Sequence, residues 1–225
     1  VKIASPEVNH LPMLKALAAY RAEQKANGDS AIPVILSSGV SRLSDIETAL
    51  SILGTENLTL LHCITSYPAP ESEYNVRVLS SLRRVFGVPA GISDHSLDPI
   101  LVPSLAAAMG GVMTEKHITL SRKTDGLDDP VALEPEQFAL MVHAVHQSQA
   151  AVNRYGPEIA RKKIMSQLAE QYNEKMITAI MGDGVKRLAN AEKANYGRTN
   201  RSLHFMHDMK SGDTLNASDI GVLRT

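Results

Sequence analysis

The sequence has 225 residues, of which 44% are hydrophobic and 21% charged, a composition typical of a soluble globular protein. Its formal net charge of −1 provides no general attraction for nucleic acid or an anionic membrane, and Cys63, the single cysteine, excludes an intrachain disulfide. No apolar stretch approaches the roughly 20 residues of a membrane span. We therefore predict a cytoplasmic protein that binds neither nucleic acid nor membrane.

Five short apolar segments recur along the first half of the chain. They are rich in Val, Ile and Leu and nearly continuous, as strands buried on both faces of a parallel sheet are. These predicted strands are residues 1–5, 33–39, 58–64, 88–93 and 111–118.

Helical patterns follow the strands. In residues 43–54, Ser44 and Glu47 have the spacing of a capping box, and residues 75–87 end in a glycine stop at Gly87. Further helices are predicted in residues 98–111 and 134–152. A strand followed by a helix, repeated about every 25 to 30 residues, indicates βα units and a parallel sheet.

Two parallel architectures are compatible with these units. A doubly wound sheet is usually accompanied by a glycine-rich phosphate loop, and the sequence contains none. A (β/α)8 TIM barrel places functional residues at the carboxyl end of its strands, and every predicted strand here ends in polar residues. The barrel is therefore favoured. Because eight units are needed, we expect only the later strands here, with roughly three units upstream.

The remainder of the chain differs from the βα units. A helical pattern begins at Pro157 and is followed by a polar linker, and the last 25 residues predict a strand, a turn and the start of another strand. We predict a partial barrel domain in residues 1–150, a helical insertion and linker in 151–200, and the start of a small domain in 201–225.

Two polar clusters, "GISDHS" (91–96) and "MTEKHI" (113–118), end two successive strands. Adjacent strands lie about 4.8 Å apart, so His95 and His117 can reach one ion at about 2.1 Å each. Asp94 points to the opposite face and is expected to support the site rather than bind metal. From the pattern alone, two hydrogen-bonded structural histidines are the favoured interpretation.

Several motifs in order resemble the sialic acid synthase family, which includes N-acetylneuraminate synthases and spore coat polysaccharide biosynthesis proteins. They are "KIASPEVNHLPML", "VILSSGVSRLSDIETAL", "LLHCITSYPAPESEYNVRVLSSLRRVFGVPAGISDHS" and "GGVMTEKHITLSRKTDGLDDPVALEP". The stretch "RSLHFMHDMKSGDTLNASDIGVLR" resembles the start of that family's antifreeze-like (SAF) domain. The resemblance implies a (β/α)8 barrel, usually a homodimer in which the antifreeze-like domain of one subunit covers the site of the other.

The resemblance also implies a reaction and a set of residues. The family condenses phosphoenolpyruvate with an N-acetylmannosamine-type amino sugar to a nine-carbon 2-keto acid, using a divalent metal. Mn²⁺ is expected, with Mg²⁺, Fe²⁺ or Zn²⁺ as alternatives. By motif position, the metal ligands are His95 and His117, the catalytic carboxylates are Glu7 and Glu115, and the substrate contacts are Lys2, Ser5, Ser37, Thr65, Tyr67, Ser93 and Asp128.

Two other functions remain open at this stage. One is a different metal-dependent barrel aldolase or lyase that uses the same two histidines. The other is a non-catalytic, degenerate homologue that binds an anion or a partner. Ser121 and the stretch "DGLD" (125–128) depart from the family pattern on the sugar side, so the resemblance leaves the sugar open.

Overall fold

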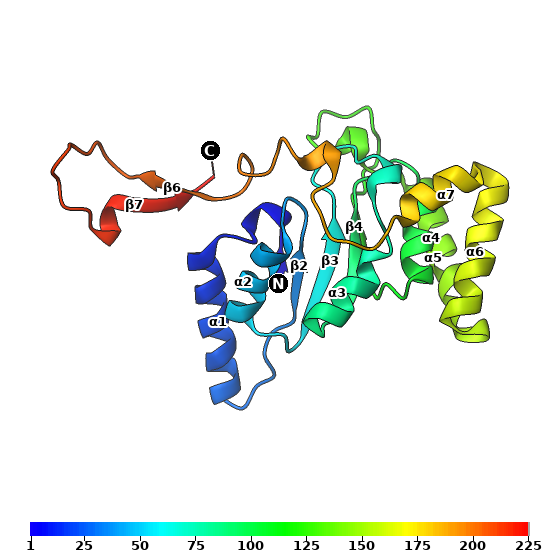
Figure 1. The fold of residues 1–225 in the computed structure, drawn as a ribbon, viewed down its shortest axis with the longest axis horizontal. Helices are drawn as coiled ribbons and strands as arrows, with labels where there is room; N and C mark the ends of the chain where they lie inside the picture. Colours follow the sequence, from blue (N-terminus) through cyan, green and yellow to red (C-terminus); the bar gives the residue numbers. More distant parts are fainter. Residues whose placement is uncertain (225) are drawn as a thin grey trace.

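Five parallel strands form the central sheet of the computed structural model, which describes residues 1–224. They pair in chain order, β1 next to β2 and so on to β5. A helix follows each of the first four strands and returns the chain to the next one (Figure 1). The strands are β1 (Lys2–Ile3), β2 (Val34–Ser37), β3 (Leu58–Cys63), β4 (Ala90–Asp94) and β5 (Thr114–Lys116).

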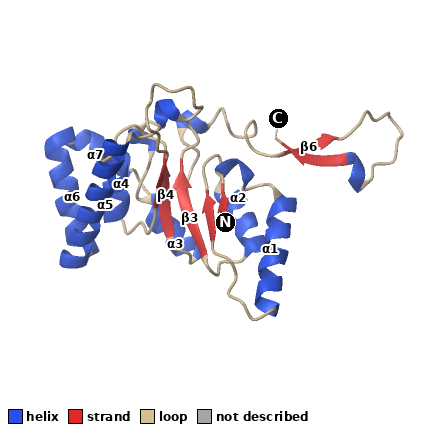
Figure 2. Ribbon diagram, turned by 180° about the vertical axis from the view of Figure 1, so that it is seen from behind, coloured by secondary structure: helices blue, strands red, loops and turns tan. Residues whose placement is uncertain are grey.

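The helices lie on one face of this sheet. In Figure 2, which shows the molecule from behind, β3 and β4 lie in front of α3. The helices between strands are α1 (Leu11–Ala26), α2 (Leu43–Leu53), α3 (Val78–Phe86) and α4 (Leu101–Ala108). After β5 come α5 (Pro135–Tyr155), α6 (Pro157–Tyr172) and α7 (Glu174–Met181).

Alternation along the strands separates the two faces of the sheet. Leu36, Leu60 and Ile92 are almost fully buried in one apolar core with the helices. Residues one position further along, such as Ser37 and Ser93, therefore point to the other, concave face. The site residues predicted on these strands share that face because of this period of two.

The sheet is strongly curled. The Nζ of Lys2 on β1 lies 3.3 Å from Oε1 of Glu115 on β5. In a flat sheet these two strands would be four spacings, about 19 Å, apart. The fold is therefore half of a (β/α)8 barrel, as the sequence predicted, with its polar strand ends drawn together.

Local details of the helices agree in part with the sequence. The predicted stop of α3 at Gly87 is confirmed by its left-handed conformation, φ 67°. The capping box predicted from Ser44 and Glu47 is wrong by two positions. The Asp45 carboxylate instead accepts a hydrogen bond from the backbone N–H of Arg42, 2.7 Å away, and caps α2 there.

Beyond the sheet, the chain continues as helices and a hairpin. Ile164 of α6 and Ile180 of α7 belong to the same apolar core as the barrel strands. Residue 150, the predicted end of the barrel domain, lies inside α5. β6 (Ser202–Phe205) and β7 (Ile220–Leu223) form an antiparallel hairpin that extends away from the half-barrel (Figure 1). Within residues 1–224, no helix combines the length and apolar composition needed to cross a bilayer.

Gly91 on β4 is a point of close strand packing. A Cβ placed there would lie 2.3 Å from the carbonyl oxygen of Met113 and 2.9 Å from Cδ2 of Leu61. Because the first contact is with backbone, it is not relieved by a rotamer change. We expect Gly91→Ala to lower the free energy of unfolding by about 1–3 kcal/mol, measured by urea denaturation. An unchanged unfolding midpoint would contradict this packing.

Candidate active site

The two histidines lie at the carboxyl ends of neighbouring strands. The ring centres of His95 and His117 are 5.3 Å apart and tilted by 46°. Tyr67, on the loop after β3, stacks on His95 at 4.2 Å and meets the edge of His117 at 5.8 Å. One aromatic ring therefore fixes the orientation of both imidazoles.

Hydrogen bonding determines which nitrogen of His95 is free. Its Nδ1 lies 2.8 Å from the carbonyl oxygen of Ile64. A carbonyl can only accept, so Nδ1 carries the proton and Nε2 is left for another partner. The ring is only 5% exposed, and its backbone N–H donates to the hydroxyl of Tyr74 at 2.7 Å. His95 is therefore a packed residue as well as a candidate ligand.

His117 is the more open of the two. Its Nδ1 lies 3.5 Å from Oδ2 of Asp128, a carboxylate that favours the Nδ1–H form of the ring. Burial and the neighbouring His95 lower the pKa of His117, which favours a neutral imidazole. Burial is the largest single influence on the pKa of His95 and lowers it, but Cys63, whose Sγ lies 3.8 Å from Nδ1, the Ile64 carbonyl and Asp94 together outweigh burial and leave that pKa raised.

These residues fit a divalent cation. Two imidazoles bound to one ion at about 2.1 Å place their ring centres roughly 5 Å apart at a right-angled geometry, close to the arrangement here. Within residues 1–224, no group of three or more His, Cys, Asp and Glu side chains is arranged to hold a metal. A cation here would have His95 and His117 as its protein ligands, with its other positions open.

A second cluster spans the concave face from β1 to β5. Glu115 lies 3.3 Å from the Nζ of Lys2, and its Oε1 accepts a hydrogen bond from Ser93 at 2.7 Å. The Oγ of Ser37 and the Oγ1 of Thr65 are buried without a hydrogen-bond partner. Buried hydroxyls of this kind mark a place where a bound molecule or water completes the hydrogen bonding.

Ser5 and Thr65 meet at Gly39. The backbone N–H of Gly39 donates to Oγ of Ser5 at 3.0 Å, and a Cβ on Gly39 would lie 2.2 Å from Oγ1 of Thr65. Only glycine permits this approach. The loops after β1, β2 and β3 are therefore in direct contact, and their hydroxyls lie close together.

Glu7 is paired with Arg201 and with His10, whose Nδ1 lies 3.4 Å from Oε2. Its carboxylate accepts two hydrogen bonds from the guanidinium of Arg201, each 2.7 Å long. Those bonds outweigh burial and lower its pKa. The predicted catalytic role of Glu7 stays a prediction, because proton transfer from this carboxylate would first require its release from Arg201.

Asp94, Lys116 and His62 lie on the face of the sheet that packs on the helices. Asp94 and Lys116 form a fully buried ion pair, 2.7 Å long, and Asp94 also accepts from the backbone N–H of Ser96. As its position in the strand predicted, Asp94 does not point toward His95 and His117. His62 donates from Nε2 to the carbonyl oxygen of Tyr74 at 2.7 Å, and burial lowers its pKa to about 3, so it is a structural residue.

Sequence reasoning missed the contributions of the segment after α7. Arg201 binds Glu7, and Glu192 binds the backbone of two barrel loops. Their partners are 127 to 194 positions away, so no local pattern signals them.

The fold and the site are those of a (β/α)8-barrel protein with its polar centre at the carboxyl ends of the strands. The chain belongs to the NeuB family, which it matches over residues 1–155. It is 30% identical to N,N'-diacetyllegionaminic acid synthase of Campylobacter jejuni, over 99% of this chain and 56% of that protein. The chain thus spans about half the length of such relatives.

Two solved structures resemble it over their shared region. One is the spore coat polysaccharide biosynthesis protein spsE of Bacillus subtilis, with a TM-score of 0.75 and 27% identity, over 99% of this chain and 56% of that one. The other is N-acetylneuraminic acid synthetase of Leptospira borgpetersenii, with a TM-score of 0.58 and 29% identity, over 87% of this chain and 55% of that one.

The ion pair between Glu7 and Arg201 links the barrel to the hairpin. We expect Arg201→Ala to speed the limited proteolysis of the segment from residue 201 to the hairpin at neutral pH, with Arg198→Ala, an exposed neighbour, as the control. Because the pKa of Glu7 is lowered, the stabilisation is present above its ordinary value of 4.5 and is lost as the pH falls through the lowered value. Acid should therefore remove the difference between wild type and Arg201→Ala. Equal proteolysis of the two at neutral pH would contradict this role.

Proposed function

We propose that the protein is a sialic-acid-type synthase that condenses phosphoenolpyruvate with an N-acylated amino sugar and releases phosphate. The observation that carries this proposal is the pairing of His95 and His117, each with Nδ1 at an acceptor, beside the cluster of Lys2, Ser93 and Glu115. Membership of the NeuB family supports the same reaction. The reaction consumes water: the enol carbon bonds to the sugar aldehyde, and water replaces phosphate.

The proposed substrate contacts follow from charge and hydrogen bonding. Lys2 provides a cation for the carboxylate or phosphate of phosphoenolpyruvate. The hydroxyls of Ser5, Ser37, Thr65 and Ser93 provide short donors on the same concave face. Glu115, in contact with both Lys2 and Ser93, is placed to accept or return a proton when the substrate takes over those partners.

On the other side of the site, the histidines and their neighbours would receive the sugar. A divalent cation, Mn²⁺ in this proposal, would polarise the aldehyde as a Lewis acid. His95 and His117 would hold it through Nε2, and Tyr67 keeps both rings in position. The exposed Asp128 carboxylate orients His117 and is available to the sugar hydroxyls. We further propose a homodimer, with residues 201–225 opening the antifreeze-like domain.

The test is phosphate release from phosphoenolpyruvate with Mn²⁺ and a panel of N-acylated amino sugars, with the product identified by mass spectrometry. We expect release that requires both the metal and a sugar, together with a nine-carbon 2-keto acid. Cleavage or condensation that proceeds without phosphoenolpyruvate would favour a barrel aldolase. Absence of metal- and sugar-dependent turnover would exclude the synthase.

A further inference from the structure

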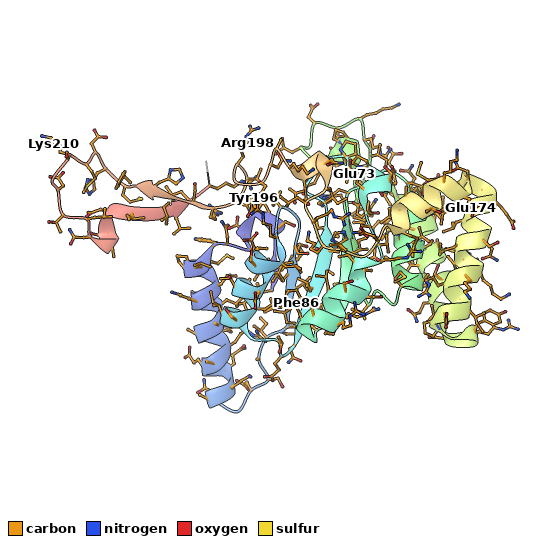
Figure 3. The ribbon with its side chains drawn as sticks, in the orientation of Figure 1. Glu73, Phe86, Glu174, Tyr196, Arg198 and Lys210 are labelled. Carbon is orange, nitrogen blue, oxygen red and sulfur yellow. The ribbon has the colours of Figure 1, made fainter. Side chains whose placement is uncertain are left out.

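The segment that joins α7 to the hairpin passes over the carboxyl ends of the barrel strands. It is drawn in orange in Figure 1, and Figure 3 labels Tyr196 and Arg198 on it. It includes a 3-10 turn, η4 (Asn190–Glu192), whose Glu192 is only 1% exposed. We call residues 182–201 the strap. A buried carboxylate at this place needs strong partners.

The carboxylate of Glu192 binds two barrel loops at once. Its Oε2 accepts hydrogen bonds from the backbone N–H of Val40, at 2.8 Å, and of Thr65, at 2.9 Å. Its Oε1 accepts from Ala189 within the strap, at 3.2 Å. Val40 follows β2 and Thr65 follows β3. One side chain of the strap therefore fixes the distance between two adjacent loops.

Two asparagines of the strap bind the carbonyl groups of the same two residues. Asn195 donates to the carbonyl oxygen of Thr65 at 2.8 Å, and Asn200 donates to that of Val40 at 3.2 Å. Val40 has φ 42°, a left-handed conformation that is unfavourable for a β-branched residue. Such a conformation persists when surrounding contacts determine it, and here the strap supplies contacts on both sides of the residue.

The loops held in this way carry the proposed phosphoenolpyruvate contacts. Gly39, next to Val40, touches Oγ1 of Thr65 and donates to Ser5. These contacts leave no free space, so a shift of either loop moves the hydroxyls of Ser5 and Thr65 relative to each other. The backbone bonds of Glu192 determine that spacing.

We propose that Glu192 is a positioning residue for the phosphoenolpyruvate site: it acts through the backbone of Val40 and Thr65 and touches no substrate. This inference rests on the proposed function. A purely structural role, as the cap of η4 on Ala189, would alter the stability of the protein but not its affinity for one substrate.

The kinetic test compares Glu192→Ala and Glu192→Gln with Asp183→Asn, a change of an exposed strap carboxylate that pairs with Arg187. For Glu192→Ala we expect the KM for phosphoenolpyruvate to rise about tenfold or more, with the KM for the sugar and the Mn²⁺ content unchanged. Glu192→Gln keeps one oxygen for the two loop N–H groups, so its KM should lie between wild type and Glu192→Ala. Asp183→Asn should match wild type.

Amide hydrogen exchange tests the same inference without activity. Peptides covering residues 38–41 and 64–66 should lose protection in Glu192→Ala and keep it in Asp183→Asn. If Glu192→Ala does not fold, Glu192→Gln tests the inference instead. It should show an intermediate KM for phosphoenolpyruvate and a partial loss of amide protection. Unchanged protection, or a lower Tm with both KM values unchanged, would overturn the inference. If the wild type does not turn over, the proposed function fails, and exchange alone decides the role of Glu192.

Discussion

Replacing His95 by Asn is expected to abolish metal retention and turnover while largely keeping the fold. The Nδ2 of Asn occupies the place of Nδ1 and can still donate to the carbonyl oxygen of Ile64, 2.8 Å away in the native protein. What is lost is Nε2, the proposed metal-binding nitrogen. Because Lewis-acid stabilisation contributes several kcal/mol, kcat should fall by about 10³-fold or more. Metal analysis, the Tm and phosphate release are the measurements.

His117→Ala should have the same effect on metal and rate with a smaller effect on stability, since His117 is less buried than His95. The matched control is His62→Gln, because His62 is a buried histidine on the opposite face of the sheet. That change should lower the Tm and leave the Mn²⁺ content unchanged. Retention of stoichiometric Mn²⁺ and near-wild-type rate in both His95→Asn and His117→Ala would show that the pair is structural.

Lys116→Met is expected to cause the largest loss of stability among the changes considered. The Lys116 ammonium and the Asp94 carboxylate are both fully buried and 2.7 Å apart. Removing the ammonium leaves a buried carboxylate with no counter-charge, which costs about 3–5 kcal/mol. The free energy of unfolding from urea denaturation measures this loss. The pair also joins the ends of β4 and β5 directly before His95 and His117, so its loss should disturb the positions of these two histidines as well.

A second change in the same background separates the charge from the packing. Asp94→Asn combined with Lys116→Met also removes the buried negative charge that Lys116→Met alone leaves unpaired. The double variant should therefore be more stable than Lys116→Met. Lys25→Met, which breaks the exposed pair with Glu56, is the control and should leave stability nearly unchanged. A Lys116→Met variant no less stable than this control would show that the buried pair contributes nothing.

The sequence by itself determined the βα order and the residues that face the barrel interior. Continuous Val, Ile and Leu segments predicted all five strands, and the period of two placed Ser93 and His95 on one face and Asp94 on the other. The polar strand ends predicted where a site would form. These features are local: they depend on neighbouring residues and on backbone geometry, so a single sequence contains them.

Only the tertiary structure decided which side chains meet. The curl of the sheet brings Lys2 to Glu115 across 113 positions, and the strap brings Arg201 to Glu7 across 194. Glu192 lies within a polar linker in the sequence, yet its carboxylate holds two barrel loops. Such contacts depend on how distant segments pack. The charged residue types that form them are common on any protein surface, so the sequence does not show which of them are paired. For that reason local patterns found the strands, whereas the partners of Glu7, Asp94 and Glu192 required the folded chain.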